Sequence, residues 1–530
     1  VAVSTISRRD RSAKHLAVAR HLESLEDEEL SGLVAAHYLE AHQAAPEGPE
    51  AEVIALGARD WLSRAGQRAL SLGSPEQALA FFEQALQVTP ASGERAALLV
   101  LAGEAAAGSN DTARALLRLE EAVGHYEAIG ALSAVGRVTA ILMRNLERYS
   151  DALERGERVF KAIGEAPGTE RARAALAREM AAMYSATGEA RRALEWAETA
   201  LVLAEQLDDP GLLAGAIGAK ASSLFNLGRH REAVILARGQ VQLAATAGVL
   251  REQANGLLYL SVFIIDDDLR EALSASMESA ELARRAGQRG VEVMDLRNAA
   301  ETSFLLGEWG DTRSAIIELR PRDVRPDQVA YLDCVEAMLL ACTGAASQAA
   351  ALIDSHAEQL AAAEAVAVRA TYLRARSVVS LAGGDIEAAR LEAAAAVSAD
   401  PFGINSPHAL AMEARAALWL SDSEGAREAL SAMAGFRGRW MAAARLTTEA
   451  GLAALDGRVE ESAEAYRAAI ESWRTLGCTL DLAMCELDLV LLLGPDDPDA
   501  SAAKEARDIF TQLGARPFLA RLDRAASAED

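Results

Sequence analysis

Lysine, aromatic residues and cysteine are all scarce in this chain of 530 residues. Among its 53 basic residues only four are lysines, and Phe, Trp and Tyr together make up 5% of the sequence. Two pairs of cysteines lie seven or eight residues apart, which on a helix is about 10–12 Å, too far for a disulfide bond. The four are Cys334, Cys342, Cys478 and Cys485. No Cys-x-x-Cys or Cys/His spacing suggests zinc, so we expect a reduced, cytoplasmic protein.

The sequence also lacks a long apolar run and an excess of positive charge. No run approaches the roughly 20 apolar residues that a transmembrane helix needs, and nothing at the N-terminus resembles a signal peptide. The formal net charge of -25 opposes nonspecific binding to nucleic acid or to an anionic membrane surface. We therefore expect partners other than nucleic acids and membranes.

Motifs of catalysis are missing as well. The sequence contains no Gly-x-x-x-x-Gly-Lys-Ser/Thr, no His-Glu-x-x-His and no Gly-x-Ser-x-Gly segment. We expect no catalytic residue, no cofactor and no metal in this chain, and a non-enzymatic role.

A few local features could carry chemistry, but each has a structural explanation that we prefer. His37 and His42 lie five residues apart, a poor spacing for two metal ligands on one helix. The acids of "IIDDDLR" (264–270) suggest a cation site or, as we favour, a solvated turn whose carboxylates cap the next helix. The irregular segment "PFGINSPHAL" (401–410) is a binding loop or, more simply, a connector in which Ser406 caps a helix with Pro407 in its first turn.

A turn followed by a helix returns along most of the chain. The stretch "LGSPEQALAFFEQALQVTP" (72–90) opens with such a turn, and a comparable turn residue recurs at nearly even intervals. These eleven turn markers are Gly73, Gly108, Glu147, Gly188, Gly228, Asp267, Gly307, Gly344, Gly384, Ser421 and Gly457. Eight are glycine, and Asp and Ser also favour turns.

A small residue follows each marker by five positions. The eleven residues are Ala78, Ala113, Ala152, Ala193, Ala233, Ala272, Thr312, Ala349, Ala389, Ala426 and Ser462. A helix that folds back on its predecessor needs a small side chain where the two cross, because a larger one would push the backbones apart. We therefore predict repeated helix hairpins, with larger residues such as Phe82, Trp196 and Tyr466 in the next layer and Pro90 ending one helix.

The repeated skeleton resembles the tetratricopeptide repeat. It is seen in Leu72, Gly73, Ala78, Ala85, Leu86 and Pro90, and again in "GEARRALEWAETAL" from Gly188 and "GRVEESAEAYRAAI" from Gly457. One hairpin cannot bury its apolar face alone, so neighbours must stack. We expect an all-α, tetratricopeptide-like, right-handed superhelical solenoid of about eleven helix hairpins.

The two ends resemble a particular class of signalling protein. The N-terminal segment looks like the junction that follows the ATPase module of actinobacterial STAND/AAA-type ATPases, which are linked to adenylate cyclase or transcriptional-regulator domains. It reads "SRRDRSAKHLAVARHLESL…ELSGLVAAHYLEAH". The segment "AKEARDIFTQLGARPFLARLD" (503–523) resembles the closing helix pair of the repeat arms of these proteins. We expect a helical junction at 1–54, the solenoid at 55–494 and capping helices with a tail at 495–530. The basic residues of the junction fall on a predicted amphipathic helix, which we prefer to a nucleic-acid arm.

Arginine is enriched at one position of the repeat. In tetratricopeptide-like arrays the first helix of each hairpin lines the concave surface, and ten residues before the marker four of the eleven repeats carry arginine. These residues are Arg137, Arg178, Arg297 and Arg374. They predict a basic stripe that binds an acidic peptide or an anionic ligand through bidentate contacts, or else arginines that bridge to acids on neighbouring helices.

The family resemblance implies a regulatory role. As the arm of a signalling ATPase, the chain is expected to hold a protein, a peptide or a small effector in its concave groove, to contact its own upstream ATPase module, and to bias that module between states. The alternative is a stand-alone scaffold that assembles protein partners. An enzyme acting within this chain is the least favoured of the three interpretations.

Overall fold

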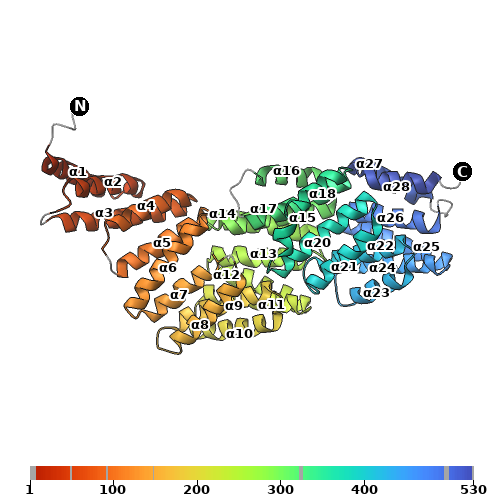
Figure 1. Cartoon of the computed structure of the whole chain (residues 1–530), viewed down its shortest axis with the longest axis horizontal. Helices are drawn as coiled ribbons and strands as arrows, with labels where there is room; N and C mark the ends of the chain where they lie inside the picture. The colour runs from red at the N-terminus through yellow and green to blue at the C-terminus, as the bar shows by residue number, and fades with distance from the viewer. Residues whose placement is uncertain are drawn as a thin grey trace. The chain divides into compact units, whose positions relative to one another are not determined.

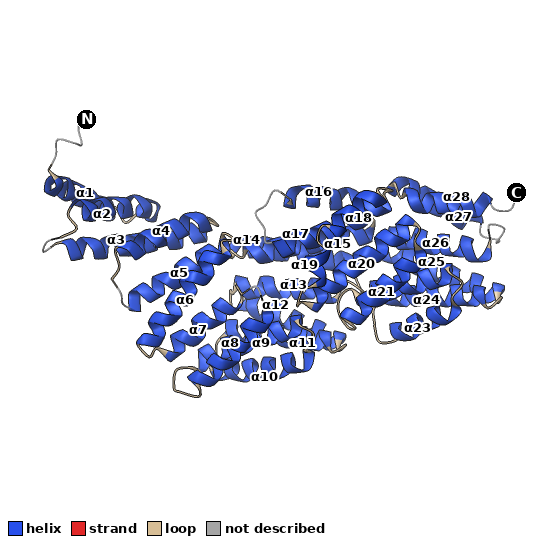
Figure 2. Cartoon of the chain, in the orientation of Figure 1, coloured by secondary structure: helices blue, strands red, loops and turns tan. Residues whose placement is uncertain are grey.

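The computed structural model describes residues 7–47, 50–90, 93–146, 148–320, 326–494 and 500–527. Within these ranges it contains 28 α-helices, one short 3-10 helix and no strand (Figure 2). The first helices are α1 (Arg8–Glu23), the 3-10 helix (Glu28–Leu30) and α2 (Ser31–Ala44), drawn in red in Figure 1. The all-α class predicted from the repeat is therefore confirmed.

Eleven helix hairpins follow, as the repeat predicts, and the two helices of a hairpin pack on one another, as α3 does on α4 and α24 on α25. In chain order they are α3 (Ala51–Ser71) with α4 (Pro75–Gln87), α5 (Gly93–Gly108) with α6 (Thr112–Ala128), α7 (Leu132–Met143) with α8 (Tyr149–Ile163), α9 (Glu170–Ala186) with α10 (Ala190–Gln206), α11 (Pro210–Asn226) with α12 (His230–Thr246), α13 (Leu250–Phe263) with α14 (Leu269–Arg285), α15 (Arg289–Leu306) with α16 (Trp309–Leu319), α17 (Pro326–Cys342) with α18 (Ala346–Asp354), α20 (Val366–Gly383) with α21 (Ile386–Ala399), α22 (Ser406–Trp419) with α23 (Ser423–Met433), and α24 (Arg439–Leu455) with α25 (Val459–Leu476). The short α19 (Ala357–Ala361) precedes α20. The chain is thus a tetratricopeptide-like solenoid of helix hairpins.

The predicted turn markers close the hairpins through a left-handed residue. A positive φ occurs at eight of the eleven markers, namely Gly73, Gly188, Gly228, Gly307, Gly344, Gly384, Ser421 and Gly457. The residue after the marker donates its N–H to the carbonyl oxygen five residues earlier, as Glu189 does to Tyr184 at 2.8 Å. This Schellman arrangement satisfies carbonyl groups that the end of a helix leaves free, and glycine adopts it without steric cost. Asp267 closes its turn without a positive φ, and Glu147 lies outside the described residues.

The prediction for the second hairpin is wrong by two residues. Gly108 is still helical, and the left-handed residue is Asn110, with a φ of 59°. Ala113 is accordingly exposed, whereas Ala115 is completely buried. Asparagine tolerates the left-handed region because its short polar side chain can hydrogen-bond locally, so the turn did not need its glycine.

The small residue after each turn lies where the two helices of the hairpin cross. When Ala113 in the predicted set is corrected to Ala115, all eleven of these residues have no solvent exposure. Each occupies the first turn of the second helix, where Ala193, for example, donates its N–H to Glu189 O at 3.0 Å. Opposite them some first helices carry glycine, and a Cβ on Gly103 would lie 2.7 Å from Leu119 Cγ. The helices therefore approach to near backbone contact.

The two ends of the array are helical as predicted. Helix α1 packs on α2, and α2 packs on α3, so the basic residues of the N-terminal segment lie on a helix. At the other end α26 (Thr479–Leu493) is followed by the predicted pair, α27 (Ala500–Leu513) and α28 (Arg516–Ser527). Among the residues expected in the next layer, Phe82 and Tyr466 are fully buried and Trp196 is half-buried, while α4 ends at Gln87, just before Pro90. The division of the chain at 54 and 494 remains a prediction.

The chain divides into two compact units. Unit 1 contains residues 1–180, 199–212 and 284–289, and unit 2 contains residues 181–198, 213–283 and 290–530.

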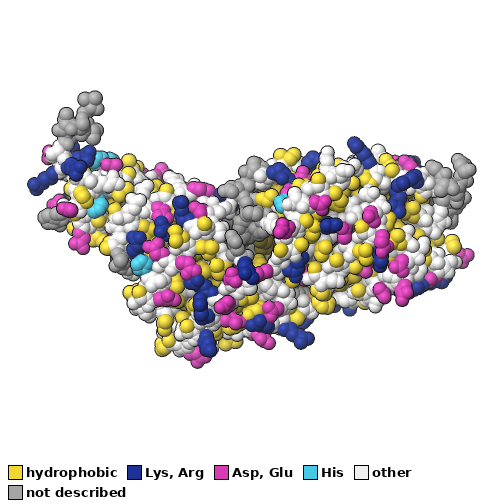
Figure 3. All heavy atoms as spheres, in the orientation of Figure 1, with side chains coloured by type: hydrophobic (Ala, Val, Ile, Leu, Met, Phe, Trp, Pro, Cys, Tyr) yellow, Lys and Arg dark blue, Asp and Glu magenta, His cyan; other side chains and the backbone are white. Residues whose placement is uncertain are grey.

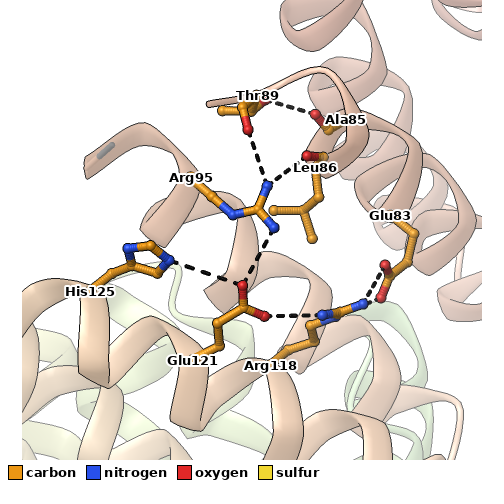
Figure 4. A network of polar contacts seen from close by, with 8 residues as sticks. All are labelled: Glu83, Ala85, Leu86, Thr89, Arg95, Arg118, Glu121 and His125. Atoms are coloured by element: carbon orange, nitrogen blue, oxygen red, sulfur yellow. Dashed lines mark hydrogen bonds and ion pairs between the residues drawn. The ribbon is translucent and has the colours of Figure 1, made fainter. Parts of the chain in front are cut away.

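In unit 1, Arg95 on α5 holds the end of the preceding hairpin: its Nη1 donates to the carbonyl oxygens of Leu86 at 2.7 Å and Thr89 at 3.1 Å (Figure 4). Its Nη2 reaches Glu121, which also accepts from Arg118. These hydrogen bonds join one hairpin to the next.

In unit 2, hairpin turns meet helix starts that lie several hairpins further along the chain. A Cβ placed on Gly188 would come within 3.1 Å of Val366 at the start of α20, and one on Gly228 would come equally close to Phe402, just before α22. A Cβ on Gly438, before α24, would likewise meet Asp266. One on Gly307 would meet Thr479 at the start of α26, and one on Gly344 would meet Arg516 at the start of α28. We call this series of contacts the seam. Its nearly constant offset along the chain shows that unit 2 returns on itself.

We predict that replacing Ala115 with leucine destabilises the protein and that replacing Ala113 does not. Leucine at the buried crossing forces α5 and α6 apart, at a cost of about 1–3 kcal/mol in the free energy of unfolding. Leucine at the exposed position changes that free energy by less than about 0.5 kcal/mol. Urea denaturation followed by circular dichroism measures both, and an equal effect of the two substitutions would contradict the corrected register.

Candidate binding surfaces

Arg137 and Arg178 lie on the first helices of two successive hairpins in unit 1. Arg137 on α7 is exposed, and no hydrogen bond or ion pair within the described ranges holds it. Arg178 on α9 is half-buried, and its Nη2 donates to Glu179 Oε1 at 2.7 Å. Arg144, at the end of α7, also reaches Glu179, with its Nε 3.5 Å from Oε1. Because residues seven apart share a helix face, Arg137 and Arg144 lie on the same side of α7.

These arginines lie on the first helices of two successive hairpins. Glu179 is buried, and two arginines compete for its carboxylate. We call Arg137, Arg144 and Arg178 the basic patch. Sequence reasoning missed Arg144, although its spacing of seven residues from Arg137 was the available signal.

Arg297 and Arg374, in unit 2, are brought together around one buried carboxylate. Arg374 on α20 has 4% of its surface exposed and pairs with Glu301 on α15, whose Oε2 accepts from the Tyr331 hydroxyl at 2.7 Å. The guanidinium of Arg297 lies over the ring of Tyr331, 3.6 Å from its centre. Burial alone would raise the pKa of Glu301, but Arg374 and the Tyr331 hydroxyl hold that pKa below its usual value. Arg374 thus adopts the alternative role considered from sequence, a bridge to an acid on a neighbouring helix, and its binding of a partner remains a prediction.

A second ionic group fills the interior of unit 2 nearer the C-terminus. Asp488 on α26 accepts from Arg415 Nε at 2.9 Å and from Trp419 Nε1 at 2.7 Å. Asp481, on the same helix, accepts from Trp440 Nε1 at 3.2 Å. Burial raises the pKa of Asp481 and of Asp488, against the opposing effect of Arg415. The signal in the sequence was an acid within an apolar run, as in "CELDLVLLL" (485–493), which favours a buried and paired carboxylate.

The space left between these interior groups is small. One cavity of about 10 Å³ is lined by Arg415, Trp440, Asp481 and Asp488, and another of about 20 Å³ is lined by Ser276, Glu301, Tyr331 and His408. Each has room for about one water molecule. Neither of these two cavities therefore has room for a ligand larger than water.

The thiols and the acidic turn show no reactive arrangement within the described residues. All four cysteines are buried, and burial raises the pKa of Cys334 and of Cys342 to about 12, so both thiols stay protonated. In the "IIDDDLR" turn Asp268 caps α14 by accepting from Glu271 N at 3.0 Å, as predicted. The turn is not simply solvated, however, because Asp267 and Asp268 also contact Arg439 across the seam.

The structure also shows the surroundings of Ser406, Pro407 and His37, which the sequence analysis singled out. Ser406 does not cap α22, contrary to the prediction: its hydroxyl donates to Asp400 O, and Asn405 precedes the helix, while Pro407 lies in the first turn as expected. Burial and the nearby His15 lower the pKa of His37, whose Nδ1 lies 2.9 Å from His15 Nδ1. Where side chains are described, no three His, Cys, Asp or Glu residues are grouped to hold a metal ion. No described helix is both long enough and apolar enough to cross a bilayer.

Asp295 on α15 is buried without a cationic partner in direct contact. Its Oδ2 accepts from Ser279 Oγ at 2.6 Å, and its Oδ1 has no hydrogen-bond partner among the described residues. Burial raises the pKa of Asp295 to about 8, against smaller opposing effects of Ser279 and Arg297. The carboxyl group is therefore neutral at pH 7.

No model of a known protein family and no curated protein matches the chain. Among solved structures it is similar to a STAND protein with a tetratricopeptide repeat sensor from Pyrococcus horikoshii (13% identity, TM-score 0.34, 59% of this chain and 53% of that one). It is also similar to a Rap protein complexed with competence and sporulation factor (12% identity, TM-score 0.40, 77% of this chain and 99% of that one). A third similar structure is the APC/C hetero-tetramer Cut9-Hcn1 (15% identity, TM-score 0.45, 90% of this chain and 96% of that one). The chain spans about half of the length of the STAND protein. At these identities and TM-scores the similarities assign neither a ligand nor an activity to the chain.

We predict that Asp295→Asn stabilises the protein, and more so at pH 8 than at pH 5. The unfolded chain loses the Asp295 proton near pH 4, whereas the folded chain keeps it to about pH 8. The stability contributed by the neutral form is complete below about pH 4 and declines by up to about 1.4 kcal/mol per pH unit as the pH rises towards 8.

Asparagine removes this proton linkage and keeps an oxygen for the Ser279 hydroxyl. Melting temperatures of the variant and the parent at pH 5 and pH 8 measure the difference. The exposed Asp354, replaced by asparagine, is the control for a general charge effect. A gain that is the same at both pH values would show that Asp295 is ionised in the folded protein.

Proposed function

We propose that the chain is the non-catalytic, ligand-binding regulatory arm of a multidomain signalling ATPase of the adenylate cyclase or transcriptional regulator type. The arm binds a protein, a peptide or a small effector on the surface made by the first helices of its hairpins. Binding stabilises one arrangement of the hairpins and so shifts the state of an upstream ATPase module. The chain itself neither hydrolyses ATP nor binds a cofactor.

The observation that carries the binding role is the basic patch. In a chain of net charge -25, Arg144 and Arg178 both contact the buried Glu179, and Arg137 is exposed on the same face of α7 as Arg144 without a partner among the described residues. On the face that Figure 3 shows, acidic and basic side chains are interspersed over most of the array, and basic side chains also gather near its N-terminal end, where α1 carries Arg8, Arg9 and Lys14. Guanidinium groups favour a partner that carries carboxylates, because each carboxylate can accept two parallel hydrogen bonds.

The regulatory role is supported by the N-terminal end of the array. The N-terminal segment that resembles an ATPase junction forms α1 and α2, and α2 packs on α3, the first helix of the first hairpin. A change in that hairpin is thereby passed to the segment which, by resemblance, adjoins the ATPase. Buried packing of this kind transmits displacement because it has little free volume.

The alternative is a stand-alone scaffold that assembles protein partners through the same surfaces. The reading frame upstream of the Val1 codon separates the two proposals. A continuous frame that contains Gly-x-x-x-x-Gly-Lys-Ser/Thr supports the arm, and a stop codon with a ribosome-binding site just before Val1 supports the scaffold.

We predict that the basic patch binds acidic peptides. A fluorescein-labelled library of peptides rich in Asp and Glu, measured by fluorescence anisotropy, is expected to contain binders whose affinity falls at least about tenfold in the Arg137→Ala/Arg178→Ala variant, a loss of about 1.4 kcal/mol. Arg155→Ala is the matched control, because Arg155 is also an arginine of unit 1 but pairs with Glu120 between α6 and α8. Unchanged affinity in the double variant would exclude the patch as the binding surface.

A further inference from the structure

Two histidines face each other between the first two helices of the chain. His15 on α1 and His37 on α2 are both half-buried, and their Nδ1 atoms lie 2.9 Å apart. The centres of the two rings are 5.2 Å apart, and the rings are tilted by 39°. A separation of 2.9 Å between two nitrogen atoms is that of a hydrogen bond. We call this contact the histidine clasp.

The histidine clasp requires one proton between the two rings. An imidazole nitrogen donates when it carries a hydrogen atom and accepts when it carries a lone pair. The bond is therefore formed when both rings are neutral and one of them is the Nδ1–H tautomer, and also when only one ring is charged. When both rings are charged, two N–H groups point at each other, so the hydrogen bond is lost and the two positive charges repel.

The surroundings of the clasp oppose the second positive charge. Burial and the charge of His15 lower the pKa of His37, and Glu40, three residues further along α2, opposes them to a smaller extent. Arg11 and Lys14 flank His15 on α1, but within the described residues neither they nor any charged group of α3, which also packs on α2, shifts this pKa. The clasp therefore persists in neutral solution and breaks on acidification below the ordinary pKa of histidine, about 6.5.

Acid consequently weakens the packing of α1 on α2. Below about pH 6.5 the separated helices take up a proton at each histidine, whereas the packed helices resist the second proton. The stability contributed by the clasp is complete above about pH 6.5 and is lost as the pH falls through the lowered pKa of His37. At pH 5.5 the equilibrium constant for separation of the helices is increased by up to about tenfold.

The other hydrogen bonds between α1 and α2, in the part of the chain that the structure describes, contain no histidine. The Ser12 hydroxyl donates to Ala41 O at 2.8 Å, and the Tyr38 hydroxyl donates to Glu23 Oε2, also at 2.8 Å. These bonds and the apolar packing of the hairpin remain when the clasp breaks. Mild acid therefore loosens α1 but does not release it.

We propose that the histidine clasp is an acid-sensitive contact, which holds α1 firmly on α2 in neutral solution and loosens it in mild acid. Its regulatory role rests on the proposed function, in which α1 and α2 form the junction with an upstream ATPase module. A looser α1 transmits less of any displacement of the first hairpin to that module, because the transmission depends on close packing. The rest of the array stays folded.

Asparagine at position 37 provides the matched variant. Its side-chain amide both donates and accepts, and it reaches the place of the histidine Nδ1 atom, so His37→Asn keeps a hydrogen bond to His15 whether or not His15 is charged. His21→Asn is the control, because His21 is also on α1 but is exposed and lies outside the clasp.

Hydrogen–deuterium exchange of the full chain, read by mass spectrometry on peptides from residues 11–23, measures the opening of α1. Rates are compared between variants at the same pH, which removes the effect of pH on the chemistry of exchange. The rate of the parent divided by that of His37→Asn is expected to be about three- to tenfold larger at pH 5.5 than at pH 7.5. His21→Asn is expected to behave as the parent does. A ratio that is the same at both pH values would overturn the proposal.

A titration followed by NMR of the chain with ¹⁵N-labelled histidine tests the shared proton directly. The His37 signal, assigned by its loss in His37→Asn, is expected to titrate at a lower pH in the parent than in His15→Asn, where no second positive charge can form. Equal midpoints in the two proteins would show that the rings do not share a proton, and the proposal would be wrong.

These measurements read α1 itself and need no upstream module. If they fail, the clasp is excluded and the proposed function stands. If they succeed in a chain whose reading frame has no upstream ATPase, the acid-sensitive clasp is supported and the proposed function falls.

Discussion

The fold depends on one steric constraint, the absence of room where the two helices of a hairpin cross. Every described crossing is occupied by Ala, Thr or Ser without solvent exposure, in the first turn of the second helix. The turn fixes this position, because a left-handed residue closes the first helix and places the small side chain five residues later. At seven of the eleven crossings, a slippage of one residue in either direction would bring a larger side chain to the crossing. Turn chemistry and packing therefore specify the same register, which is the agreement between local and global preferences that defines one native state.

The architecture could be read from the sequence because this constraint repeats. Small residues at a fixed spacing from a turn predict the helix hairpins even though no family model matches the chain. The error at Gly108 shows the limit of the signal: both Gly108 and Asn110 are acceptable turn residues, and only the packing of Ala115 against α5 selects between them. Ser406 failed for a related reason, since its hydroxyl satisfies the carbonyl of Asp400 and is no longer available to the helix.

The candidate surfaces were predictable only in part. The spacing of the arginines located four side chains on first helices, but it could not distinguish an exposed Arg137 from a buried Arg374. That difference depends on Glu301, which lies far from Arg374 in the chain and reaches it only through the stacking of hairpins. The seam was not predictable at all, because it joins segments that are distant in the sequence and leaves no periodic trace beyond a glycine such as Gly438.

The interior charges of unit 2 constrain its fold, because they lie within a large apolar core. An apolar interior would gain stability from every contact and would resist separation, whereas a buried ion pair contributes little net stability against apolar packing. Removing one member of a buried pair is strongly destabilising, because the other charge is then left buried and unpaired. Arg374 with Glu301 and Arg415 with Asp488 therefore hold together helices that lie far apart in the sequence, and only the intact pairs are compatible with the apolar core around them.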